Sequence, residues 1–137
     1  MNSPMTRSTA RLEGVVPILS VRDLKRSVEY YVRALGFKVD WEHTGVMAGI
    51  SRNGAGLMLC EGDQGHPGTW IWFGVSDADQ LFSEFRASGA IIGMPPTNYA
   101  WAYELHVQDP DGHVLRFGSE SKEHQPILPW KMWYAGT

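Results

Sequence analysis

The chain has 137 residues, 43% apolar and 20% charged, which suits one globular domain with a buried core and does not indicate disorder. Its net charge of −3 gives no reason to expect nucleic acid or a membrane as a partner, and no apolar run reaches the length of a signal peptide or transmembrane helix. The single cysteine, Cys60, excludes an intramolecular disulfide and suits a reducing compartment, so we expect a cytoplasmic protein.

The first elements form a strand, a helix and three strands. Residues 1–13 are polar and aperiodic and are expected to be flexible. An apolar run from Val15 to Val21 predicts a strand. Asp23 stands where a helix N-cap belongs, apolar residues then recur at helical spacing, and Gly36 is a natural residue to end the helix. Further strands are predicted over 37–42, 46–52 and 57–61, with Asn53-Gly54 as the turn before the last.

A linker over residues 62–68, which contains glycines and a proline, leads to a second series of elements. Residues 70–75 predict a strand, and Asp77 and Gly89 mark the start and the end of a helix. The two prolines within residues 94–98 predict a loop, because proline cannot donate a hydrogen bond in a central strand. The remaining predicted strands begin at Ile91 and cover 103–108 and 114–118, the last two joined by a turn at 109–112.

The two series repeat one pattern. The N-cap residues Asp23 and Asp77 are 54 residues apart, and the turn glycines Gly54 and Gly112 are 58 apart. We therefore expect an α+β fold of two tandem βαβββ modules with a cleft between them. The expected domain covers 14–118, with module one over 14–61 and module two over 69–118. The aromatic tail, 119–137, is expected to pack on this domain or on a second subunit.

Strand alternation indicates which side chains face the cleft. The candidate ligand-binding residues that it gives are Trp70, Trp72, Glu104, His106, Arg116, Met58 and Cys60. Pairing between Glu104 and Arg116 explains both charges equally well, and His106 is more readily explained by a hydrogen bond on its strand. Glu104 and His106 are also the catalytic candidates, as acid or base.

The other titratable residues give no further site. Glu104 and His106 without a visible third ligand do not predict a metal site. The remaining histidines fall at loops or turns, where we expect solvated side chains: His43, His66 and His113. Cys60 is expected to be a small buried apolar residue rather than a nucleophile.

The order of elements, the Val-x-Asp start of each helix, Leu35-Gly36-Phe37 and Asp109-Pro110-Asp111-Gly112 resemble the glyoxalase/bleomycin-resistance/extradiol-dioxygenase group, also called the vicinal oxygen chelate superfamily. In the metal-dependent members, the resemblance implies ligands at the cleft-facing positions Val16, Met58, Trp70 and Arg116 of this chain. None of these residues is a usual ligand for a divalent cation, and Arg116 would repel one. The resemblance therefore favours the members that lack the metal ligands, with no cofactor.

Residues 15–23, Tyr30-Tyr31 and the segment Tyr99-Ala100-Trp101 look most like bleomycin-resistance proteins, which bind their ligand without chemistry. The resemblance implies a homodimer in which flat aromatic groups of the ligand stack on tryptophan, and it adds Trp101 to Trp70 and Trp72 as a ligand-binding candidate. One alternative is a divergent enzyme, a lyase or isomerase, that uses Glu104 and His106 with or without a divalent metal. Another is an accessory module whose aromatic tail binds a second protein.

Overall fold

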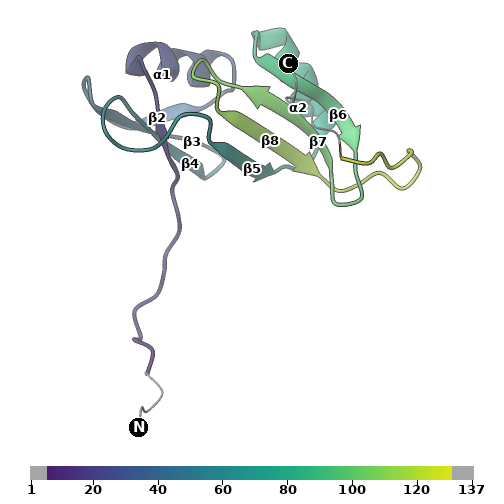
Figure 1. Ribbon diagram of the computed structural model, residues 1–137, viewed down its shortest axis with the longest axis horizontal. Coiled ribbons are helices and arrows are strands. Elements are labelled where there is room, and N and C mark those ends of the chain that lie inside the picture. The colour runs from purple at the N-terminus through teal and green to yellow at the C-terminus, as the bar shows by residue number, and fades with distance from the viewer. Residues whose placement is uncertain (1–5, 131–137) are drawn as a thin grey trace.

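The computed structural model describes residues 6–130, so the predictions for residues 1–5 and for Met132, Trp133 and Tyr134 lie outside the described residues. Residues 6–17 form no helix or strand and extend away from the body (Figure 1). Module one contains β1 (Ile18–Ser20), α1 (Leu24–Arg33), β2 (Lys38–His43), β3 (Met47–Arg52) and β4 (Ala55–Cys60). Module two contains β5 (Trp70–Gly74), α2 (Ala78–Ser88), β6 (Ile91–Asn98), β7 (Tyr103–Gln108) and β8 (Val114–Ser119).

Each module builds one four-stranded sheet, and the two sheets have the same topology. Sheet one has the order β1-β4-β3-β2, and sheet two has the order β5-β8-β7-β6. The first strand of each module pairs in parallel with the last, and the other pairs are antiparallel. The predicted α+β fold of two tandem βαβββ modules is therefore confirmed.

Both helices begin where the sequence predicts. The Asp23 carboxylate accepts a hydrogen bond from the Arg26 backbone N–H at 3.1 Å, and Asp77 accepts one from the Gln80 N–H at 3.0 Å. Each bond satisfies one of the backbone donors that a helix start leaves without a partner. Gly89 ends α2 with a φ of 85°, a left-handed conformation that costs glycine little.

The loop predicted over residues 94–98 is wrong, because β6 runs through both prolines to Asn98. Two features of the sheet accommodate them. β6 is an edge strand, so its outer side requires no donors, and its pairing with β7 shifts register between Met94 and Thr97. Sequence alone did not show that this strand lies at an edge.

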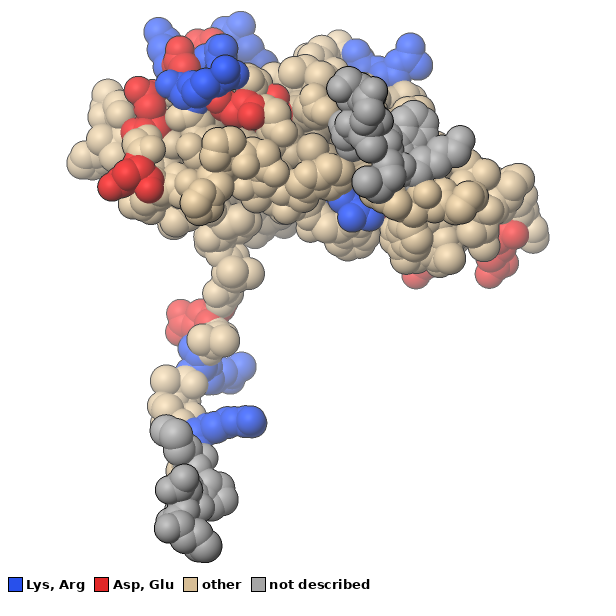
Figure 2. Space-filling view, viewed as in Figure 1, with Lys and Arg blue, Asp and Glu red and all other residues tan. Residues whose placement is uncertain are grey.

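One hydrophobic core extends across both modules. Leu19, Leu59 and Tyr31 of module one and Phe85 and Phe117 of module two belong to the same buried cluster. Both helices lie on one side of the sheets (Figure 1), so their apolar faces and one face of each sheet form this core. In Figure 2, charged side chains gather over α1, whereas few appear over the strands. Among residues 6–130, no helix is long and apolar enough to cross a membrane.

Hydrogen bonds between side chains and loops also join the two modules. The Tyr31 hydroxyl donates to Oδ2 of Asp109 at 2.8 Å. The His113 imidazole lies 2.6 Å from the Ser20 carbonyl through Nε2, and its Nδ1 accepts from the Thr69 N–H at 3.0 Å. The expectation that His113 is solvated is therefore wrong, since its side chain is buried at the junction. His43 and His66 are exposed, as expected.

Candidate functional site

Three polar side chains meet on the face of sheet two that the helices do not cover. Glu104 and His106 lie two residues apart on β7, and Arg116 lies on β8 directly opposite His106. Because alternate residues of a strand share a face, all three point to the same side. Strand alternation predicts this arrangement from sequence, and the structure brings the three side chains into contact.

Glu104 is the centre of this group. One carboxylate oxygen accepts from Arg116 Nη2 at 2.7 Å and Nε at 3.1 Å, and it lies 3.1 Å from His106 Nε2. The other oxygen accepts from the Trp72 indole Nε1 at 2.9 Å. Glu104 and His106 have no exposed surface, and the Arg116 side chain is one-quarter exposed. Both explanations raised from sequence, a Glu104–Arg116 pair and a hydrogen-bonded His106, therefore describe this geometry.

The environment of Glu104 keeps it ionised. Burial alone raises the pKa of a carboxyl group, but the hydrogen bonds from His106, Trp72 and Arg116 outweigh burial and lower the pKa of Glu104 to about 2. A carboxylate with so low a pKa, whose two oxygens already accept hydrogen bonds, is a poor general base at neutral pH. The group is better suited to positioning its neighbours than to proton transfer.

The neighbour that Glu104 positions most directly is Trp72. The indole lies over the β8 backbone at Gly118, where an added Cβ would stand 2.5 Å from its Cζ2. Trp72 remains 49% exposed and Trp70, two residues earlier, 46% exposed, so both rings present surface to solvent. Trp70 also contacts His106 edge-on, with 5.9 Å between ring centroids. Two tryptophans thus flank the polar group and are held by it.

Replacing Gly118 with alanine is expected to displace the Trp72 ring and break its bond to Glu104, because the new Cβ and the indole cannot both occupy this space. We expect a red shift in tryptophan emission and a loss of stability of about 1–2 kcal/mol, from one displaced ring and one lost hydrogen bond. Fluorescence spectra and urea unfolding measure both effects. Gly56→Ala is the matched control, since the nearest atom to its added Cβ is 3.7 Å away. An unshifted Gly118→Ala spectrum would contradict the assignment.

The candidates from module one lie on the corresponding face of sheet one. Met58 is half-buried and pairs with Ile18, whereas Cys60 is 2% exposed. Sequence reasoning missed Trp41 of β2. This residue pairs with Gly49, which in turn pairs with Met58, and its ring packs on Gly49 and is 43% exposed. The register shift of β2 just before Trp41 turns this residue to the uncovered face, so strand alternation gave no signal for it. The structure places the Met58 and Cys60 candidates on sheet one and the other six in module two.

Trp101 lies outside the strands, in the connection between β6 and β7. Its ring stacks on Tyr99 with centroids 4.7 Å apart and planes inclined by 7°, and it is 53% exposed. A second tryptophan, Trp130, connects it to the polar group, because the Trp130 ring lies 5.9 Å from those of Trp101 and His106. Sequence reasoning placed Trp130 in the tail and did not include it in the site.

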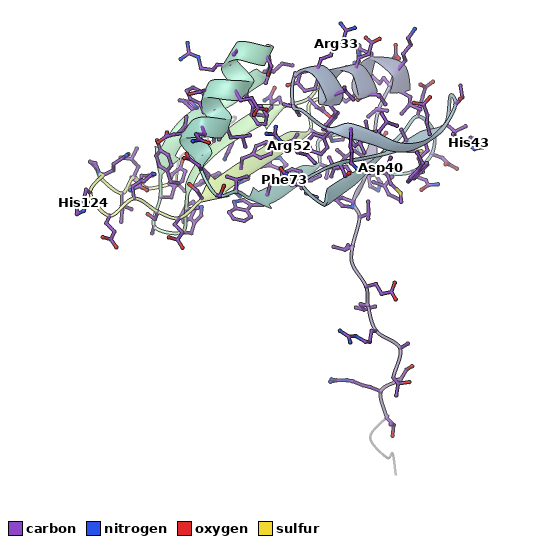
Figure 3. The ribbon with its side chains drawn as sticks, turned by 180° about the vertical axis from the view of Figure 1, so that it is seen from behind. Arg33, Asp40, His43, Arg52, Phe73 and His124 are labelled. Carbon is purple, nitrogen blue, oxygen red and sulfur yellow. The ribbon has the colours of Figure 1, made fainter. Side chains whose placement is uncertain are left out.

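The chemistry of the donor set does not favour a metal ion. The positions where the resemblance implies ligands carry Val16, Met58, Trp70 and Arg116, which offer a divalent cation no carboxylate or imidazole. Within the described residues, no group of three or more His, Cys, Asp or Glu side chains is arranged to hold a metal. His43 and His124 lie at opposite ends of the molecule (Figure 3).

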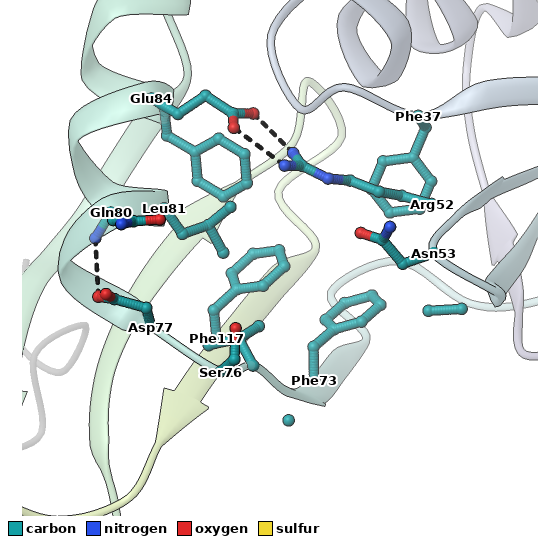
Figure 4. Close-up of a pocket in the computed structure, with 14 residues that line it drawn as sticks. Phe37, Arg52, Asn53, Phe73, Ser76, Asp77, Gln80, Leu81, Glu84 and Phe117 are labelled. Atoms are coloured by element: carbon teal, nitrogen blue, oxygen red, sulfur yellow. Dashed lines mark hydrogen bonds and ion pairs between the residues drawn. The ribbon is translucent and has the colours of Figure 1, made fainter.

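A separate pocket of about 420 Å³ lies between the modules on the core side of the sheets. Phe37, Phe73 and Phe117 line it, and Arg52 and Glu84 form a two-bond ion pair beside it, with N–O distances of 2.6 and 2.9 Å (Figure 4). None of the ligand-binding candidates lines this pocket. Apart from Trp101 in the β6–β7 connection, the candidates lie on the uncovered faces of the sheets.

A family model described as the Glyoxalase/Bleomycin resistance protein/Dioxygenase superfamily matches residues 11–117. No curated protein matches the sequence. Among solved structures, TioX from Micromonospora sp. ML1 is 24% identical, with a TM-score of 0.67, over 82% of this chain and 100% of that one.

Two further similar structures are those of ligand-binding proteins. The bleomycin-binding protein of bleomycin-producing Streptomyces verticillus, in complex with copper(II)-bleomycin, is 24% identical with a TM-score of 0.64, over 83% of this chain and all (100%) of that one. TnmS3, an antibiotic binding protein from Streptomyces sp. CB03234, is 21% identical with a TM-score of 0.68, over 82% and 100% of the two chains. At these identities the likeness establishes a shared fold.

Proposed function

The chain belongs to the Glyoxalase/Bleomycin resistance protein/Dioxygenase superfamily, and we propose that it is a small-molecule binding protein of the bleomycin-resistance type. Its ligand is flat or aromatic and is sequestered, without a metal or cofactor, on the tryptophan-lined face of sheet two. The observation that carries the proposal is the fixed, half-exposed Trp72 ring, which packs on Gly118 and donates to a buried carboxylate. A ring held in this way stacks on a ligand with little further loss of conformational freedom.

The remaining candidates have supporting parts in this proposal. Trp70 and Trp101 offer additional aromatic surface, Glu104 and His106 hold the tryptophans from below, and the partly exposed Arg116 orients the ligand. Met58 and Cys60 contribute from sheet one. The bleomycin-binding and antibiotic-binding proteins that share the fold support a ligand of this general kind.

We propose a cytoplasmic homodimer as the working assembly. Trp41 of module one, in register with Gly49 and Met58 on the uncovered face of sheet one, is 43% exposed, and a second copy that covered it would remove apolar surface from water. Covering this face would also enclose the ligand more fully than one sheet can. The aromatic tail, in this proposal, packs on its own domain.

The alternative, a lyase or isomerase that uses Glu104 and His106, is less well supported. The pKa of about 2 leaves Glu104 with little proton affinity at neutral pH. Both residues are fully buried, so a substrate would have to displace a covering ring before reaching them.

The test is a tryptophan fluorescence titration with bleomycin and with a planar cationic dye. We expect saturable quenching at micromolar ligand, and about three- to tenfold weaker binding by Trp72→Ala, because one aromatic pair contributes about 0.5–1.5 kcal/mol beyond its buried area. Phe82→Ala, which removes a ring from the helix side, is the matched control and should bind as the wild type does. Absence of quenching, or equal affinity of the Trp72→Ala variant, would count against the proposal.

A further inference from the structure

The tail after β8 lies beyond the 11–117 match to the family and is fixed to the sheet at Asn98. This side chain is 3% exposed, and its amide donates to the carbonyls of Lys122 at 2.9 Å and Gln125 at 3.2 Å. Its oxygen accepts from the Lys122 N–H at 2.8 Å, and its backbone carbonyl accepts from the Leu128 N–H at 2.8 Å. The segment from Lys122 to Leu128 is therefore held in place at the end of β6 by the side-chain amide and the backbone carbonyl of one buried residue, Asn98.

Two residues further on, the tail delivers the Trp130 ring to the polar group. Its ring lies under the Arg116 guanidinium, with 5.1 Å from Cζ to the ring centroid. The same ring lies 5.9 Å from His106 and 5.5 Å from Tyr99, tilted against both. Trp130 is 38% exposed, so its indole ring is partly enclosed by these side chains and is not buried in the core.

The residues around the Trp130 ring determine which kind of group can bind in its place. A guanidinium over an aromatic face favours an electron-rich ring such as indole. Glu104 already neutralises the charge of Arg116, so the site of the Trp130 ring does not require an anionic ligand. Trp70 is held in β5, whereas Trp130 is carried by the tail outside the strands. The Trp130 ring can therefore leave without the loss of a strand pairing.

We propose that Trp130 occupies, within its own chain, an aromatic subsite of the ligand face. The subsite is formed by Arg116, His106, Tyr99 and Trp101, and it takes an electron-rich, uncharged aromatic ring. A ligand that carries such a ring binds by displacing Trp130. The role of the subsite rests on the function proposed above, but its occupancy can be tested independently. Because a tethered ring competes at a high effective concentration, wild-type protein binds such ligands more weakly than protein without the ring.

The probe is indole itself, titrated by calorimetry into full-length wild type and Trp130→Ala. We expect Trp130→Ala to bind indole with a Kd at least tenfold lower than that of the wild type. The double variant Trp130→Ala/Trp101→Ala should bind indole more weakly than Trp130→Ala does, because the second substitution removes one wall of the subsite. Cyclohexanol, a saturated ring, should bind Trp130→Ala more weakly than indole does. Thermal melts of each variant establish that it is folded.

Three results would overturn the subsite: equal indole affinity of the two proteins, weaker binding by Trp130→Ala, or equal binding of indole and cyclohexanol. Weaker binding would make Trp130 a wall of the ligand site rather than its occupant. The two proposals fail separately. If indole binds Trp130→Ala but bleomycin and the dye bind neither protein, the subsite stands and the binding function fails. If the dye binds but indole binds both proteins equally, the function stands and the subsite fails.

Discussion

The Arg116→Ala variant is expected to lose about 3 kcal/mol of unfolding free energy at neutral pH, the low end for breaking a buried ion pair. Glu104 would stay buried and ionised after losing two hydrogen bonds from the guanidinium, at 2.7 and 3.1 Å. We take the low end because Arg116 is itself one-quarter exposed and His106 and Trp72 still contact the carboxylate. Urea unfolding at pH 7, followed by circular dichroism, measures the difference.

This loss should depend on pH. In the wild type the folded pKa of Glu104 is about 2, below its usual 4.5. Its ionised contacts therefore contribute stability that is present above about pH 4.5 and is lost as the pH falls towards 2. The Arg116→Ala variant lacks the guanidinium that helps to keep this pKa low, so the stability gap between the two proteins should narrow across that window.

Glu104→Gln is the control for the pH dependence. It keeps the shape of the side chain but removes the titrating group, so its stability should change less between pH 5 and 3 than that of the wild type. A gap between the wild type and Arg116→Ala that stayed constant over this range would show that the ion pair is not its origin.

The part of the site that sequence could predict depends on short-range geometry. Alternation within β5, β7 and β8 is enough to place Trp72, Glu104 and Arg116 on one face, because the period of a strand is a local property. The repeat then supplies the topology, since each βαβββ unit folds into the same sheet order. Neither prediction depends on how the two sheets pack against each other.

The parts that sequence could not predict depend on distant residues. His113 follows a turn and resembles a solvated residue, yet its partner is the Ser20 carbonyl in the other module. Asn98 was assigned to a loop, and its buried amide instead holds the tail. Asn98 binds the tail up to Leu128, and Trp130 then lies beside the polar group two residues further on. Patterns along the chain carry no signal for contacts of this kind.

In the proposed function, Arg116 accounts for binding without a metal. It stands at a position where the resemblance implies a metal ligand, and its guanidinium supplies the positive charge beside Glu104. The carboxylate in turn fixes Trp72, and the guanidinium offers its face to an aromatic ring. One fixed cation thus connects the buried charge with both aromatic contacts.

The Phe117→Ala variant is expected to lose about 4 kcal/mol, a large part of the 5–15 kcal/mol that stabilises a domain of this size. Phe117 is 4% exposed, stacks on Phe73 with 4.8 Å between centroids, and contacts Phe85 edge-on at 5.2 Å. Its loss would leave a cavity beside the junction pocket that it already lines. Thermal and urea unfolding, followed by circular dichroism and by tryptophan fluorescence, measure the loss.

The same experiment tests whether the two modules fold as one unit. The core cluster runs through both modules and includes residues such as Tyr31 and Phe117, so weakening it from module two should destabilise module one equally. We expect one transition, with the two probes coincident, in Phe117→Ala as in the wild type. Phe82→Ala, at a partly buried position of α2, should lose about 1–2 kcal/mol because less apolar surface is removed. Two separated transitions would mean that each module has its own core, and the shared cleft inferred from the repeat would lose its physical basis.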